Sequence, residues 1–185
     1  MKNQLPWALC LIVLFMLACK AETTTDKADD KTAAVDTTEV MAPAEFADPK
    51  YSDIVKSGQA AFSSGDIASW MTTYADNVVY VWNNGDSLVG KQAVSDYWIK
   101  RRSEVIDTIT FSNEIYLPVK VNTPQSVEQT GIWVLSWYQT TAKYTGTGKS
   151  MTQWIHSDSH FDANDKIDRV ITYLDRAPIS AAMTK

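Results

Sequence analysis

Apolar residues follow helical spacing in the first part of the folded region and strand spacing after about residue 107. Helical spacing covers residues 51–64, 66–75 and 91–106, with Gly65 as a stop signal and Asp66 as an N-cap between the first two stretches. Between the second and third stretches, the β-branched and aromatic run VVYVWN predicts a buried strand that a turn at 83–86 closes.

The second part of the chain predicts a series of strands separated by turns. Strand-like segments cover 108–121, 131–144, 149–161 and 167–175, with turn signals at 146–148 and 162–166. In the first of these segments, alternation predicts one shared face for Ile109, Phe111, Asn113, Ile115 and Leu117. Helices followed by a run of antiparallel strands indicate an α+β domain, with helices gathered on one face of a sheet.

The first residues read as an export signal. Lys2 precedes an apolar run at 7–18 that is too short for a comfortable membrane span, and Ala18 and Cys19 end it in the manner of a bacterial lipobox. We therefore expect a signal peptide at 1–18 and lipid on Cys19, which would anchor the protein to the cell envelope on the extracytoplasmic side. The alternative is an ordinary signal peptide with an incidental Cys19.

Composition divides the rest of the chain. Residues 19–49 are rich in Thr, Asp, Ala and Lys and predict a flexible tether, followed by a single domain at 50–178 and a short tail at 179–185. The formal net charge is −5, and the basic residues form no run longer than the patch at 100–102. This charge argues against nucleic acid as a partner.

The domain also resembles a known superfamily. The run SSGDIASWMTTYADNVVYVWNNGDSLVGKQAVSDYW and the closing HFDANDKIDRVITYLD are similar to the nuclear transport factor 2-like superfamily, which includes the SnoaL-like cyclases and ketosteroid isomerase. The resemblance implies a curved antiparallel sheet wrapped around about three N-terminal helices into a cone. It also implies an internal pocket and a possible homodimer through the outer face of the sheet.

The same resemblance lets the catalytic positions of these enzymes be checked individually. The oxyanion-binding tyrosine of ketosteroid isomerase falls on Gly58 and its general base on Trp82, while the aspartate of the oxyanion site and that of the SnoaL-like cyclases fall on Ser157. None of these residues exchanges protons near neutral pH. A different constellation involving Tyr173 or Asp175 stays open.

Both histidines lie in the segment WIHSDSHF, with an aspartate midway between them. Strand alternation puts His156, Asp158 and His160 on one face, and the resemblance points Ser157 inward, so the histidines are expected to face solvent or a dimer partner. His156 and His160 would lie about 13 Å apart along a strand, too far to share one zinc ion, and no third ligand is evident for a His156–Asp158 pair. We therefore expect no metal and no cofactor.

Aromatic residues are abundant in the domain, and several are expected to face inward. If the turn at 146–148 is centred on Thr147, Ser157 lies opposite Trp137 and Ile155 lies opposite Gln139. These rings either fill a plain core or line a cavity with a few polar groups. The residues expected to line such a pocket are Trp82, Trp98, Trp137, Gln139, Gln153, Ser157 and Tyr173.

These features favour a membrane-anchored extracytoplasmic protein that binds a small apolar or amphipathic ligand, or a partner, in an aromatic-lined pocket. One alternative is a SnoaL-like lyase, isomerase or hydrolase with a non-standard catalytic constellation. Another is a structural, dimeric envelope protein. A titratable group in the cavity would favour the enzyme, and the absence of any cavity would favour the structural protein.

Overall fold

The computed structural model describes residues 41–124 and 129–185. The expected signal peptide, Cys19 and the tether up to residue 40 therefore lie outside the described residues. In order along the chain, the elements are β1 (Ala44–Phe46), α1 (Lys50–Ser64), α2 (Ile67–Met71), β2 (Tyr74–Trp82), β3 (Ser87–Val89), α3 (Lys91–Lys100), the π-helical turn η1 (Arg101–Val105), β4 (Ile106–Val121), β5 (Gly131–Tyr144), β6 (Ser150–Phe161), β7 (Ile167–Tyr173) and α4 (Arg176–Met183).

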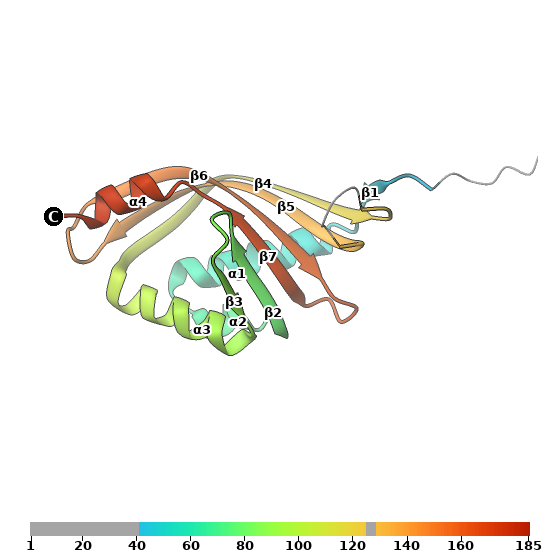
Figure 1. The fold of residues 1–185 in the computed structure, drawn as a ribbon, viewed down its shortest axis with the longest axis horizontal. Helices are drawn as coiled ribbons and strands as arrows, with labels where there is room; N and C mark the ends of the chain where they lie inside the picture. The colour runs from blue at the N-terminus through green and yellow to red at the C-terminus, as the bar shows by residue number, and fades with distance from the viewer. Residues whose placement is uncertain (1–40, 125–128) are drawn as a thin grey trace, which may run out of the picture. The chain divides into compact units, whose positions relative to one another are not determined.

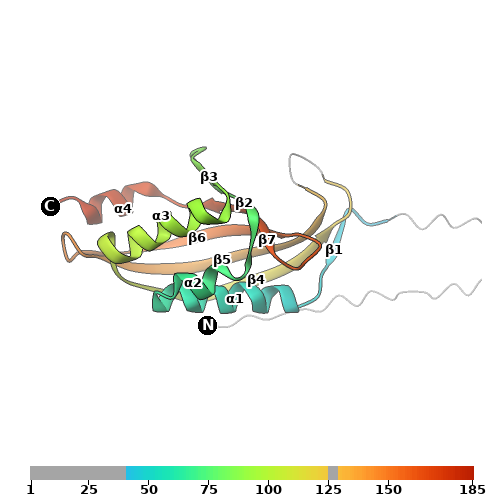
Figure 2. The ribbon, with the colours of Figure 1, turned by 90° about the horizontal axis from the view of Figure 1, so that it is seen from below.

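The strands form one curved sheet of seven in the order β1-β4-β5-β6-β7-β2-β3, and helices α1, α2 and α3 lie against its concave face (Figures 1 and 2). The predicted α+β class is confirmed. The curved sheet is antiparallel as predicted except at one pair, because β2 and β7 run parallel. A parallel pair needs a long crossover connection, which the chain from α3 to β6 provides.

The first helix ends and the second helix begins where the sequence predicts. Gly65 adopts a left-handed conformation with φ of 88° after α1, and the Asp66 side chain accepts a hydrogen bond from the Ser69 backbone N–H at the start of α2. The second helix is shorter than its apolar spacing predicts. Tyr74 instead begins β2, where it pairs with Ile167 of β7 and its ring packs on Trp70.

An irregularity in β4 changes which side chains face the helices. Asn113 has φ of 52°, and the pairing with β5 shifts between Ser112 and Ile115. Such a bulge reverses the alternation of the residues that follow it. Phe111 therefore packs against the core, whereas Ile115 is 55% exposed, so the single shared face expected for the whole segment is wrong beyond the bulge.

The structured region extends beyond the expected domain bounds at both ends. Residues 44–46 form β1 and pair with 119–121 of β4, although the composition of this stretch is that of a tether. At the other end, α4 continues past residue 178, and its Ala182 is buried in the main core cluster. Backbone pairing thus holds β1 on the sheet, and one small buried side chain holds α4 on the core. Composition reveals neither contact.

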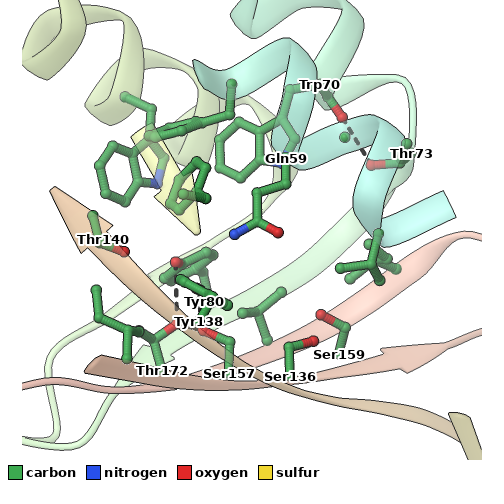
Figure 3. Close-up of a pocket in the computed structure, with 18 of the residues that line it drawn as sticks. Gln59, Trp70, Thr73, Tyr80, Ser136, Tyr138, Thr140, Ser157, Ser159 and Thr172 are labelled. Carbon is green, nitrogen blue, oxygen red and sulfur yellow. Dashed lines mark hydrogen bonds between the residues drawn. The ribbon is translucent and has the colours of Figure 1, made fainter. Parts of the chain in front are cut away.

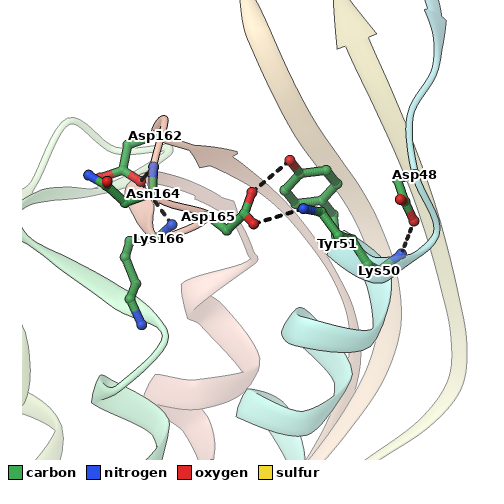
Figure 4. Close-up of polar contacts among 7 residues, drawn as sticks. All are labelled: Asp48, Lys50, Tyr51, Asp162, Asn164, Asp165 and Lys166. Atoms are coloured by element: carbon green, nitrogen blue, oxygen red, sulfur yellow. Dashed lines mark hydrogen bonds and ion pairs between the residues drawn. The ribbon is translucent and has the colours of Figure 1, made fainter.

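A polar contact fixes the start of α1 to the turn between β6 and β7 (Figure 4). The Asp165 carboxylate accepts hydrogen bonds from Lys50 Nζ at 2.7 Å and from the Tyr51 hydroxyl at 2.8 Å. The Lys50 hydrogen bond, followed by that of Tyr51, lowers the pKa of Asp165 below its ordinary value. This contact helps to position α1, whose inner side forms part of the cavity described below.

Among the described residues, no helix is long and apolar enough to cross a membrane.

Candidate functional site

A cavity of about 120 Å³ lies between the helices and the concave face of the sheet. Its walls are largely aromatic and aliphatic on the helix side and carry hydroxyl groups on the sheet side (Figure 3). The apolar lining includes Phe62, Trp70, Tyr74, Trp82, Trp98, Ile109, Phe111, Ile155, Val170 and Leu174.

The aromatic part of the wall is built from rings packed edge to face. Phe62 of α1 lies 4.8 Å from Trp70 of α2 and 4.9 Å from Trp98 of α3, measured between ring centroids, so one ring joins all three helices. Tyr80 of β2 contacts the Trp82 ring in a tilted arrangement, with 4.8 Å between the ring centroids. Packing of this kind holds the rings in fixed orientations and makes the apolar wall a preformed surface.

Hydroxyl groups reach the cavity from three neighbouring strands. Side chains alternate along each strand, so every second residue faces inward. By this alternation β5 contributes Ser136, Tyr138 and Thr140, while β6 contributes Ser157 and Ser159, and β7 contributes Thr172. The sheet therefore presents a row of neutral polar groups to a cavity whose helix side is largely apolar.

Some of these hydroxyls bond to one another. The Tyr138 hydroxyl lies 2.9 Å from Ser157 Oγ, which lies 3.2 Å from Thr172 Oγ1, and Thr172 donates to the Tyr80 hydroxyl at 3.1 Å. Figure 3 shows these labelled residues close together at one part of the cavity wall. The four groups make a continuous hydrogen-bonded series across β5, β6, β7 and β2.

Other buried polar atoms in the wall have no hydrogen-bond partner among the described residues. These atoms are Ser136 Oγ, Thr140 Oγ1 and Trp98 Nε1. An unpartnered buried hydroxyl or N–H group costs about 1–3 kcal/mol. Such atoms in a cavity wall are therefore available to a bound molecule.

Gln59 is the polar group that α1 contributes to the cavity, and its amide lies over the hydroxyl-bearing strands (Figure 3). The Tyr116 hydroxyl of β4 donates to Gln59 Oε1, which orients the amide. The Gln59 side chain therefore enters the cavity in a fixed position.

The described residues that line the cavity include no Asp, Glu, His, Lys, Arg or Cys. The titratable groups in this lining are Tyr74, Tyr80 and Tyr138, and burial raises the pKa of each, that of Tyr138 to about 12. All three stay protonated near neutral pH, so the cavity is uncharged and offers no general base there.

Among the residues that the sequence analysis assigned to a pocket, Trp82, Trp98 and Ser157 line the cavity. Gln153 lies on the same face of β6 as Ser157, but it is outside the lining. Its Oε1 accepts a hydrogen bond from the Asp175 backbone N–H where α4 begins.

Trp137, Gln139 and Tyr173 do not line the cavity, which corrects the expectation drawn from the sequence. Ser157 pairs with Ser136, and Trp137 pairs with His156, one residue away from the predicted register. A shift of one residue moves a side chain to the opposite face of a sheet. Trp137 and Gln139 therefore lie on the outer face, and Tyr173 lies there beside His156.

Neither histidine lines the cavity, and both lie on the face of β6 opposite Ser157, as the resemblance implies. The expectation that both face solvent or a dimer partner is wrong for His160, which is only 7% exposed. His156 Nδ1 is 3.0 Å from the Ser136 carbonyl oxygen, and its Nε2 is 2.9 Å from Asp158 Oδ1. His160 is buried and lies between Asp168 and the Thr130 carbonyl oxygen. Within residues 41–124 and 129–185, no group of three or more His, Cys, Asp or Glu side chains could hold a metal ion.

Sequence reasoning missed most of the polar wall, namely Gln59, Tyr80, Ser136, Tyr138, Thr140 and Thr172. The signal was present, because hydroxyl-bearing residues recur at every second position of the β5 and β6 segments. The correct β5–β6 register would have assigned Ser136 and Thr140 to the same side as Ser157.

No protein-family model matches the chain, and no curated protein matches it in sequence. Solved structures do match. A proposed polyketide cyclase from Xanthomonas campestris pv. campestris superposes with a TM-score of 0.59 at 15% identity, over 73% of this chain and 97% of that one. A nuclear transport factor 2-like protein of unknown function from Burkholderia pseudomallei gives 0.57 at 15% identity, over 73% and 98%. An LEH-like epoxide hydrolase from M. tuberculosis gives 0.52 at 12% identity, over 72% and 89%.

The chain has the nuclear transport factor 2-like fold. Gly58, Trp82 and Ser157, on which the sequence resemblance placed catalytic positions of ketosteroid isomerase and the SnoaL-like cyclases, all line the cavity. The side chains at these three positions transfer no proton near neutral pH. A Cβ on Gly58 would lie 3.1 Å from Trp70 Cδ1, so a larger residue there requires the indole ring to move.

Proposed function

We propose that the protein binds a small, uncharged and largely apolar molecule in the cavity between the helices and the sheet. The observation that supports this most directly is the combination of an aromatic wall with the unpartnered buried hydroxyls of Ser136 and Thr140. An apolar surface with a few fixed polar groups is typical of small-molecule sites. A charged ligand would enter without a counter-charge and would pay a large desolvation cost.

The size of the cavity limits the ligand. Its volume of about 120 Å³ is close to the roughly 150 Å³ of an engineered apolar protein cavity that binds benzene. A molecule with one aromatic ring and one or two small substituents is therefore the expected class.

An enzyme is the second candidate. A proposed polyketide cyclase and an epoxide hydrolase share this fold, which favours a SnoaL-like lyase, isomerase or hydrolase as the alternative. The described lining supplies serine hydroxyls without an adjacent base, because no histidine or carboxylate reaches them. Binding without proton transfer is therefore the better-supported proposal.

The location of this binding activity is a separate proposal that rests on sequence. Ala18 and Cys19 at the end of an apolar run support lipidation of Cys19, which would hold the cavity-bearing domain outside the cytoplasm at a bacterial membrane. The outer face of the sheet, with Ile115, Trp137, Trp154 and Tyr173 exposed, supports contact with a second copy of the chain. Light scattering of wild type and Trp137→Ser would detect that dimer and its loss.

The binding proposal is tested with toluene, and with benzoate as a charged probe of similar size. Toluene should raise the melting temperature in a concentration-dependent way, since it binds the folded state alone, and it should change tryptophan fluorescence. Benzoate should do neither.

Ser157→Trp is the matched variant, because its indole would fill the cavity. It should fold at a cost of about 1–3 kcal/mol and lose the response to toluene. A response to toluene that survives in Ser157→Trp, or an equal response to benzoate, would count against the cavity as the binding site.

A further inference from the structure

Four hydroxyl groups in the cavity wall form the series Tyr138, Ser157, Thr172 and Tyr80. The oxygen–oxygen distances along it are 2.9, 3.2 and 3.1 Å. Ser157, Thr172 and Tyr80 are buried, so bulk solvent has little access to their hydroxyl groups.

The number of hydrogens gives this series a direction. Each hydroxyl has a single hydrogen to donate and can accept through its lone pairs. Thr172 donates to Tyr80, so the bond between Ser157 and Thr172 must use the hydrogen of Ser157. The bond between Tyr138 and Ser157 must then use the hydrogen of Tyr138. The series therefore runs one way, from Tyr138 to Tyr80.

Tyr80 is the last member, and it receives a hydrogen bond without passing one on. Its own hydrogen has no acceptor among the described residues, since its single hydrogen bond is the one from Thr172. A hydroxyl that accepts a hydrogen bond becomes a better donor, because bonds in a series polarise one another. Tyr80 lines the cavity, which makes it a donor prepared for a ligand.

A second uncommitted donor belongs to the same cavity. Trp98 lines it, and its Nε1–H, which can only donate, has no partner among the described residues. The rings of Tyr80 and Trp98 lie in one aromatic cluster, with 6.3 Å between their centroids. A ligand that brings only carbon and hydrogen leaves both donors unpaired.

We propose that the Tyr80 hydroxyl binds an acceptor oxygen of the ligand and that the ligand class is small, neutral aromatic carbonyl compounds, such as aryl ketones. A carbonyl oxygen offers two lone pairs and brings no hydrogen of its own, so it complements a wall whose free groups include two donors. This inference rests on the proposed function of the cavity and adds the chemistry by which its occupant is chosen.

The experiment compares two molecules of nearly the same shape. Acetophenone carries a carbonyl group where α-methylstyrene carries a methylene group, and calorimetry gives the affinity of each. Acetophenone should bind wild type several-fold to about tenfold more tightly, the ratio expected for one buried hydrogen bond. The infrared carbonyl band of bound acetophenone should also lie below its position in an alkane solvent.

Two single-atom deletions identify the donor. Tyr80→Phe should bring the affinity ratio close to one while α-methylstyrene keeps its affinity. Tyr138→Phe, the matched control at the other end of the series, should keep most of the preference, because Ser157, Thr172 and Tyr80 still bond in the same direction.

The alternative outcomes are distinct. Equal binding of the two probes by wild type, or a preference that survives in Tyr80→Phe, would overturn the assignment of Tyr80. Loss of the preference in Tyr138→Phe alone would mean that the series runs the other way. Binding of neither probe would overturn the proposed function itself and this inference with it.

Discussion

The indole ring of Trp137 is stacked on the imidazole ring of His156 across β5 and β6, with 4.5 Å between the ring centroids and 22° between the ring planes. Tyr173 of β7 stacks on the other face of the imidazole ring, with 5.4 Å between the ring centroids. His156 is thus held between two aromatic rings on the outer face of the sheet, in addition to its contacts with Ser136 and Asp158.

This arrangement predicts a measurable role in stability for His156, although strand alternation alone would suggest an inconsequential surface residue. His156→Ala removes two ring contacts and the polar contacts with Ser136 and Asp158, and it should lower the free energy of unfolding by about 1–2 kcal/mol. Trp154→Ala, on the same face and 53% exposed, is the control and should change it by at most about 0.5 kcal/mol. Urea unfolding near pH 7 measures both, and equal effects would show that the stack contributes nothing.

Two threonines in the cavity wall give a matched pair of substitutions. Thr140 and Thr172 are 2% and 3% exposed, but only the Thr172 hydroxyl has partners among the described residues. Thr172→Val should cost about 1–2 kcal/mol, because it interrupts a buried series, while Thr140→Val should be neutral or stabilising. Urea unfolding of the ligand-free protein distinguishes them. A comparable loss in Thr140→Val would indicate that a buried water satisfies that hydroxyl.

The contact between Asp165, Lys50 and Tyr51 predicts a pH dependence. The lowered pKa of Asp165 means that its stabilising contribution is present above the ordinary carboxyl value of 3.8 and is lost as the pH falls through the lowered value. The Asp165 hydrogen bond raises the pKa of Tyr51, so the Tyr51 contribution is lost only as the pH rises above its ordinary value of 10.0.

Asp165→Asn tests the loss of stability at low pH, because it removes the carboxylate. Asn tolerates the left-handed φ of 57° at this position. Urea midpoints should show the variant less stable than wild type near neutral pH, with the difference shrinking below about pH 4. Lys50→Met should reduce the same pH-dependent difference only in part, because Tyr51 still donates to Asp165. A constant difference between wild type and Asp165→Asn at all pH values would contradict this account.

Lipidation at Cys19 makes a prediction about localisation. Cys19→Ala should move the protein from the membrane fraction to the soluble fraction after cell lysis and leave its signal uncleaved or cut elsewhere, because acyl chains provide the proposed attachment. Fractionation and intact-mass analysis of the mature protein measure this. A wild-type mature protein with an unmodified N-terminus would rule the anchor out.

The sequence predicted the features that depend on local chemistry. Gly65 ends α1 and Asp66 begins α2. Both features were predictable because a left-handed backbone and a side-chain cap are properties of single residues. Ser157 and His156 fall on opposite faces of β6 for the same reason, because alternation belongs to the strand itself.

The missed features depend on how strands pair. The turn between β5 and β6 holds Tyr144 N–H against the Lys149 carbonyl at 2.9 Å, so it encloses an even number of residues rather than being centred on Thr147. The two nearby glycines, Gly146 and Gly148, indicate a turn but do not determine how many residues it encloses. The resulting shift of one residue exchanged Trp137 for Ser136 in the cavity wall, and the bulge at Asn113 had a similar effect on β4.

The parallel pairing of β2 with β7 has a consequence for synthesis of the chain. β2 carries Tyr80 and Trp82, which pair with Val170 and Thr172 of the last strand, and its other neighbour is the short β3. A nascent chain that has not yet produced β7 therefore has an aromatic strand with one edge unpaired, which exposes it to aggregation. The cavity is completed only by the final strand of the sheet, so a chain cut short before Ile167 should be cleared by proteolysis instead of accumulating in a partly active form.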